Sequence, residues 1–155
     1  MSESGLEEFH RQTASKCFNE AWDYLEKKNR DAKDDQQMLH LAHTARYHRS
    51  FVGTARNFAV GDWQISRVYA AIGEPSLAIH FGKSSLERME QNNLLDILCT
   101  GYEAMARAYA VAEDYESARD YIRKAQEQLA KSTVDEEDRK IFSDQIRETE
   151  KLIGE

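Results

Sequence analysis

Residues 61–87 read GDWQISRVYAAIGEPSLAIHFGKSSLE, and residues 101–127 read GYEAMARAYAVAEDYESARDYIRKAQE. The second stretch repeats the first in phase, forty positions later. The identical pairs are Gly61/Gly101, Arg67/Arg107, Tyr69/Tyr109, Ala70/Ala110, Ala78/Ala118 and Glu87/Glu127. Two further pairs keep their chemistry, aromatic in one case and basic in the other: Phe81/Tyr121 and Lys83/Arg123. A fixed period of this length indicates a repeat architecture.

Each copy is predicted to form two helices joined by a tight turn. Helical spacing of apolar residues continues to Ile72, and Gly73 then suits a left-handed C-terminal cap. Pro75 fits the first turn of the next helix, where its missing N–H costs nothing. In the second copy Glu113 and Asp114 occupy the equivalent turn, and Asp114 is the predicted N-cap of the next helix. The second helices carry mostly small side chains at i, i+4 and i+7, which let two helix axes approach closely: Ala78, Gly82 and Ser85, then Ala118, Ile122 and Ala125.

These residues resemble the tetratricopeptide repeat (TPR) family. The resemblance is carried by Tyr69, Gly73, Ala78, Ser85, Tyr109, Ala118 and Ala125, which look like the family's tyrosine, turn glycine and small packing positions. The family's period is about 34 residues, its Trp-x-x-Leu-Gly opening is not reproduced, and Glu113 replaces the second turn glycine. The resemblance covers about residues 54–131. It implies a right-handed stack of helix pairs with a concave face lined by the first helix of each pair, and it implies no chemistry.

Length and composition fit one all-α domain covering residues 1–155. The chain is 41% hydrophobic, with one proline and seven glycines, and no run alternates for long enough to predict a strand. A net charge of −7 argues against nucleic acid and anionic membranes as partners. No apolar stretch approaches the roughly 18 residues that span a bilayer, and the amino terminus lacks a signal-peptide pattern. We therefore expect a soluble, cytoplasmic protein without a cofactor, in which Cys17 and Cys99 are small buried hydrophobic residues.

The expected order along the chain is about seven helices in antiparallel pairs, a TPR-like right-handed α-solenoid. Capping-box patterns at Ser4/Glu7 and Thr133/Glu136 predict the starts of the first and last helices. His80 lies forty positions after His40, which extends the repeat phase back to the first pair. The predicted helix pairs are 6–51, 54–92 and 94–131, with individual helices at 6–28, 34–51, 54–72, 75–92, 94–112 and 115–131. A sparsely apolar helix at 134–153 is expected to cap the stack.

The residues expected to bind a partner lie on the first helices of the two copies. Helical spacing places Trp63 and Arg67 on one face of the first, and Glu103 and Arg107 on one face of the second. Two arginines in phase beside a tryptophan would suit an acidic or carboxylate-ended peptide, because guanidinium groups bind carboxylates in a bidentate fork. The alternative is structural: Glu103 and Arg107 form a helical ion pair, and Arg67 contacts Trp63 through a cation–π interaction.

Four histidines support a second hypothesis, a metal or small-ligand site with possible enzymatic use. His40 and His43 are close enough along one helix to share a metal, and His48 or His80 could complete the site. A solvated helix face is the simpler interpretation. The sequence contains no glycine-rich phosphate loop and no Gly-x-Ser-x-Gly, His-Glu-x-x-His or Cys-x-x-Cys motif. A non-enzymatic protein or peptide interaction module is therefore favoured, and a homo-oligomer formed through exposed helix faces is a third possibility.

Overall fold

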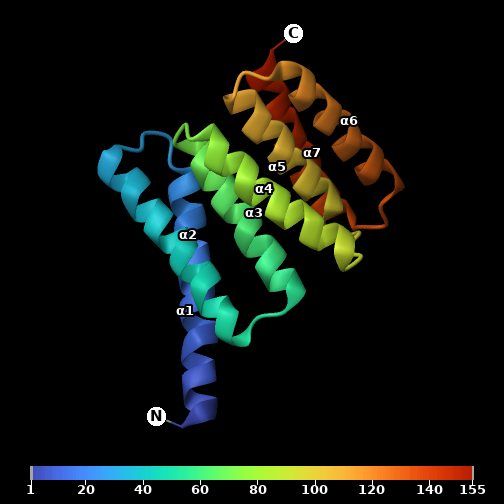
Figure 1. Cartoon of the computed structure of the whole chain (residues 1–155). Helices are drawn as coiled ribbons and strands as arrows, with labels where there is room; N and C mark the ends of the chain where they lie inside the picture. The colour runs from blue at the N-terminus through green and yellow to red at the C-terminus, as the bar shows by residue number, and fades with distance from the viewer. Residues whose placement is uncertain (1, 155) are drawn as a thin grey trace.

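The structure, a computed structural model, describes residues 2–154 and is all-helical over that range (Figure 1). Seven helices and no strands are found in these residues. Their bounds are α1 Glu3–Glu26, α2 Ala32–Val52, α3 Ala55–Ala71, α4 Pro75–Gln91, α5 Leu98–Val111, α6 Tyr115–Lys131 and α7 Glu136–Ile153. The predicted all-α class is confirmed. None of the seven described helices combines the length and the apolarity needed to cross a bilayer.

Short polar side chains begin five helices by accepting a hydrogen bond from a backbone N–H of the first turn. These N-cap residues are Ser2, Asp31, Thr54, Asp114 and Asp135. The caps predicted for the two ends of the chain are displaced by two residues, because Ser2 replaces Ser4 and Asp135 replaces Thr133. In both places two short polar residues compete for the same role, and the local pattern does not distinguish them.

Helix α5 begins at Leu98, later than the start predicted at residue 94. Asn93 has a φ of 52°, which ends α4, and the N–H of Leu94 bonds back into α4 at 2.9 Å. The residues that follow form a turn that presents Asp96 to Arg56. One guanidinium nitrogen of Arg56 lies 2.8 Å from each carboxylate oxygen of Asp96. A side-chain contact that spans forty positions thus accompanies this turn, and helical periodicity alone does not reveal it.

The forty-residue repeat is visible in two equivalent aromatic pairs. Tyr69 stacks on Phe81 with ring centroids 5.7 Å apart and planes inclined by 16°. Tyr109 stacks on Tyr121 at 5.8 Å and 7°. The two tyrosines therefore lie in similar surroundings, as the repeat in the sequence predicts.

The turns between paired helices are also equivalent. Gly73 and Glu113 both adopt left-handed backbone conformations, with φ of 80° and 62°. The N–H of Glu74 donates to the carbonyl of Tyr69 at 2.9 Å, and the N–H of Asp114 donates to that of Tyr109 at 3.0 Å. The two first helices end in the same way although one turn lacks the glycine.

Small side chains lie where neighbouring helices approach closely. A Cβ atom added to Gly82 of α4 would lie 2.8 Å from the sulfur of Met105 in α5 and 3.1 Å from Oγ of Ser66 in α3. The Ser66 hydroxyl donates to the carbonyl of Ala78 at 2.7 Å. The contact between α3, α4 and α5 therefore depends on the glycine, which extends the prediction drawn from the small-residue spacing.

The helices fall into two groups by their contacts. Helices α1, α3, α5 and α7 form a series in which each contacts the next, while α2, α4 and α6 each pack against two members of that series (Figure 1). The buried apolar clusters follow the same order, one shared by α1, α2 and α3, others by α3, α4 and α5, and one by α5, α6 and α7. The series of first helices carries the candidate site.

Candidate functional site

A largely apolar pocket of about 300 Å³ lies along the series α1, α3, α5 and α7. We call it the tryptophan pocket, because both tryptophans of the chain line it. Each helix of the series contributes side chains, and Met89 and Ile97 complete the wall. The lining residues are Phe18, Asn19, Trp22, Val60, Trp63, Met89, Ile97, Thr100, Ile141, Phe142 and Gln145.

The two tryptophans form one aromatic wall of this pocket. Trp22 of α1 stacks on Trp63 of α3 with ring centroids 5.5 Å apart and an angle of 23°. The guanidinium carbon of Arg67 lies 5.5 Å from the Trp22 ring and 5.6 Å from the Trp63 ring. These cation–π contacts stabilise the arrangement of the two rings. The predicted contact between Arg67 and Trp63 is therefore present, and Trp22 is a second partner that the local pattern did not indicate.

Two polar atoms of residues that line the tryptophan pocket are buried without a hydrogen-bond partner in the described chain. They are the indole nitrogen Nε1 of Trp63 and the side-chain oxygen Oε1 of Gln145. A buried polar group without a partner costs about 1–3 kcal/mol. Such groups are uncommon in folded proteins, and the described chain has two others, Oε1 of Gln64 and Nε of Arg88, on residues that do not line this pocket.

The charged residues predicted to bind a partner form an internal network instead of an open surface. Glu103 is 1% exposed and Arg67 is 8% exposed. Nη1 of Arg67 donates to Oε1 of Glu103 at 2.9 Å, and Nε of Arg107 donates to Oε2 at 3.0 Å. The hydroxyl of Thr149 in α7 donates to the same Oε2 at 2.6 Å. Arg67 therefore does not present a free guanidinium, and the predicted helical ion pair of Glu103 with Arg107 is present.

The physical reason is the contact between α3 and α5, which brings Glu103 against Arg67 across 36 sequence positions. Burial lowers the pKa of the Arg67 guanidinium, and the negative charge of Glu103 opposes that change. Arg107 also reaches Glu148 and the backbone carbonyl of Gln145, both at 3.3 Å. Of the predicted partner-binding residues, only Trp63 lines the tryptophan pocket. A direct role of Arg67, Glu103 and Arg107 in binding stays a prediction.

The four histidines of the second hypothesis lie in different surroundings. Nε2 of His43 lies 3.0 Å from the hydroxyl of Tyr69, and burial lowers the pKa of His43. Nδ1 of His48 lies 2.8 Å from Nδ1 of His10 in α1, and His40 and His80 are exposed. Across residues 2–154, no three His, Cys, Asp or Glu side chains are placed to share a metal ion. The predicted sharing of a metal by these histidines is therefore not supported by the geometry.

The cysteines lie apart and both are free thiols. Cys99 is 2% exposed, and burial raises its pKa to about 12, so the thiolate is strongly disfavoured. Cys17 is partly buried, and burial raises its pKa as well. Both residues pack within apolar clusters, as predicted.

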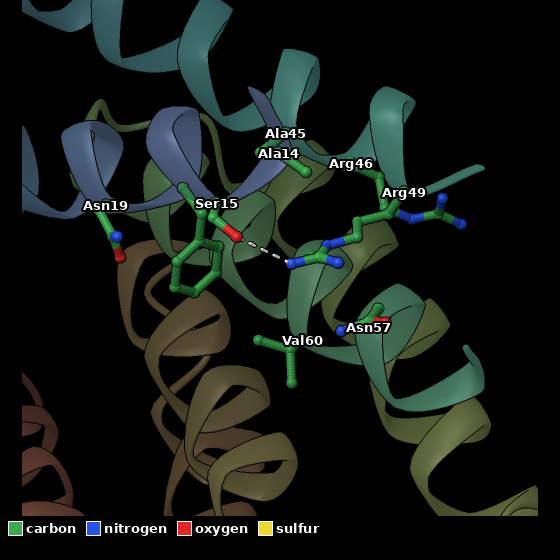
Figure 2. A pocket seen from close by; sticks show the side chains of 10 residues that line it. Ala14, Ser15, Asn19, Ala45, Arg46, Arg49, Asn57 and Val60 are labelled. Atoms are coloured by element: carbon green, nitrogen blue, oxygen red, sulfur yellow. Dashed lines mark hydrogen bonds between the residues drawn. The ribbon is translucent and has the colours of Figure 1, made fainter. Parts of the chain in front are cut away.

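A second pocket of about 200 Å³ lies between α1, α2 and α3. We call it the arginine pocket. Its polar lining comprises Ser15, Asn19, Arg46, Arg49 and Asn57 (Figure 2). It shares Phe18, Asn19 and Val60 with the tryptophan pocket, so the two cavities adjoin. No sequence pattern singled out Arg49, because the first helix pair is the most divergent part of the repeat.

Comparison of the chain with family models, with curated proteins and with solved structures found no match.

Proposed function

We propose that this chain is a non-enzymatic, TPR-like module that binds a segment of another protein along α1, α3, α5 and α7. In this proposal the helices form a right-handed solenoid of antiparallel pairs, and the partner inserts one bulky apolar side chain into the tryptophan pocket. The contacts within and between successive helix pairs support this arrangement. The tryptophan pocket is the observation that carries the proposed function.

The composition of the tryptophan pocket favours an apolar anchor. Its walls present two indole rings and Phe18, Phe142 and Ile97, and binding energy at protein interfaces is concentrated where a bulky side chain fills such a pocket. A volume of about 300 Å³ stands at the lower end of the range for small-molecule sites and is large enough for one aromatic side chain.

The experiment selects peptides from a random library displayed on phage and measures their affinity by intrinsic fluorescence. Both tryptophans line the pocket, so binding there should change the emission of the unmodified protein. We expect the selected peptides to share a bulky apolar residue. Ile141→Glu places a charge at the rim and should weaken their binding by about 10- to 100-fold. Ile141 is 46% exposed, so we expect this change to leave the fold intact.

Leu152→Glu is the matched control. Leu152 belongs to the same helix as Ile141, is 51% exposed and is not among the residues that line the tryptophan pocket. Its replacement should leave affinity unchanged. Failure to enrich any peptide, or equal binding by the Ile141→Glu variant and the native chain, would overturn the proposal.

A further inference from the structure

The arginine pocket contains one positive charge that no carboxylate of the described chain neutralises. Arg46 is paired, because its Nε donates to Oδ1 of Asp62 at 3.0 Å. Arg49 forms no ion pair among residues 2–154, and its Nη2 donates only to the hydroxyl of Ser15, at 3.2 Å. Figure 2 shows the Arg49 guanidinium reaching across the cavity from α2 toward Ser15 of α1.

Apart from Arg46, the polar groups that line the cavity with Arg49 are neutral and able to hydrogen-bond. The hydroxyl of Ser15 and the amides of Asn19 and Asn57 line the same cavity. The Arg46–Asp62 pair sums to zero, which leaves a net charge of about +1 from Arg49. A monoanion balances that charge, whereas a dianionic phosphate would leave an excess of negative charge. Carboxylate is the monoanion that matches the planar guanidinium fork.

The position of the arginine pocket links it to the tryptophan pocket. Phe18, Asn19 and Val60 line both cavities, so the two cavities are neighbours, as a ligand that binds in both requires. We propose that the preferred ligand of this protein carries a carboxylate that binds Arg49 in the arginine pocket beside an apolar group in the tryptophan pocket. This inference rests on the proposed function, since it assumes that the tryptophan pocket is occupied.

Gly61 of α3 allows the close approach of Arg46 at the arginine pocket. A Cβ atom added to Gly61 would lie 2.7 Å from Cδ of Arg46. The glycine therefore lets the Arg46 side chain lie along α3 and reach Asp62. Because Arg46 is paired with Asp62, Arg49 is the arginine of this pocket that is available to bind a ligand.

The test uses a fluorescent apolar probe and two competitors that differ in charge. N-phenyl-1-naphthylamine, an uncharged dye, reports occupancy of the tryptophan pocket. 1-Naphthylacetate and 1-naphthylacetamide then compete with it, one with a carboxylate and the other with an amide. We expect the carboxylate to displace the dye at about 10-fold lower concentration than the amide, since a charge-assisted hydrogen bond to a guanidinium is stronger than a neutral one.

Three variants test whether Arg49 causes the preference for the carboxylate over the amide. Arg49→Gln should bring the ratio of the two competitors close to one and leave dye affinity unchanged. Arg49→Lys should retain part of the ratio, because it keeps the charge and loses the fork. Arg123→Gln, which removes an exposed arginine of α6 outside both pockets, should keep the full ratio. Circular dichroism confirms that each variant is folded.

The outcomes separate the two proposals. If the dye does not bind, or binds equally to the Ile141→Glu variant, the tryptophan pocket is not a binding site and the proposed function fails with the present inference. If the dye binds there but the native chain shows a ratio near one, only the carboxylate site is overturned. A ratio that survives Arg49→Gln also overturns it.

Discussion

Gly73 and Glu113 show what a single residue contributes to the repeat. Both occupy the left-handed region, which glycine adopts freely and which costs other L-residues roughly 1–2 kcal/mol. No atom lies within 4 Å of the place where a Cβ of Gly73 would stand, so a change there tests the backbone alone. The equivalent turn therefore folds around Glu113 at an energetic cost.

The two turns predict opposite effects of reciprocal substitutions. Gly73→Ala should lower the free energy of unfolding by about 1 kcal/mol, because alanine is strained at this φ. Glu113→Gly should raise it by a similar or smaller amount, since glycine also loses more backbone entropy on folding. Urea denaturation followed by circular dichroism measures both. Equal destabilisation by the two variants would contradict the equivalence of the turns.

His43 predicts a dependence of stability on pH. Burial lowers its pKa below the ordinary value of about 6.5, while Asp62 raises it and His40 lowers it. Above pH 6.5 His43 is neutral in the folded and the unfolded states, and its linkage adds nothing. As the pH falls below 6.5 the unfolded chain binds the proton first, so the free energy of unfolding decreases until the folded pKa is passed.

The measurement compares the urea midpoint at pH 7.5 and pH 5.5 in the native chain and in a His43→Gln variant. Glutamine keeps a hydrogen-bonding group near the Tyr69 hydroxyl and does not titrate. We expect a smaller loss of stability at pH 5.5 in the variant. A loss equal to that of the native chain would assign the effect to other groups, among them His48, whose pKa burial also lowers.

At the scale of elements, hydrogen bonds and ion pairs of Glu103 link α5 to α3 and to α7. Its two carboxylate oxygens accept from Arg67, Arg107 and Thr149, which belong to three helices. The packing of α7 is therefore more than apolar contact. Replacing one partner of such a buried cluster leaves charges without compensation, which is costly.

Glu103→Gln should accordingly lower the free energy of unfolding by about 3–5 kcal/mol, because Arg67 would stay buried without a counter-charge. Glu148→Gln is the control: Glu148 also contacts Arg107, but its side chain is 59% exposed and its ion pair is solvated. We expect at most a few tenths of a kcal/mol there. Urea denaturation distinguishes them, and similar losses in both variants would show that the buried cluster contributes little.

Much of this level of structure was predictable from the sequence. The starts of α4 and α6 were predicted at the observed residues, because Pro75 and Asp114 are local signals. The end of α6 at Lys131 was also predicted. The start of α5 was not, since the turn before it is accompanied by the contact between Arg56 and Asp96. The burial of Arg67 and the stacking of Trp22 on Trp63 were not predicted either, because both depend on contacts between different helices. Helical periodicity gives the face of a residue and does not give its partner on another helix.

At the scale of the whole molecule, the apolar clusters overlap through shared helices. Helix α3 contributes to the cluster with α1 and α2 and also to those with α4 and α5, and α5 links these to the cluster with α6 and α7. In repeat proteins, stability is a sum of such local units and of the interfaces between neighbours. With only three pairs and α7, those interfaces should couple the whole chain.

We therefore expect one cooperative unfolding transition. Tryptophan fluorescence reports on α1 and α3, which contain both indoles, while circular dichroism reports on all seven helices. The two urea curves should coincide within error, as a two-state transition requires. An earlier fluorescence transition would mean that the α1–α3 region unfolds separately from the rest.

The tryptophan pocket is lined by side chains of both α1 and α7, the first and last helices of the described chain. A ligand bound in that cavity would contact the first and last helices at the same time and stabilise their packing. A ligand that binds only the folded state would then slow the opening of the C-terminal segment. Slower amide hydrogen exchange in Glu136–Ile153 on ligand addition would show this stabilisation.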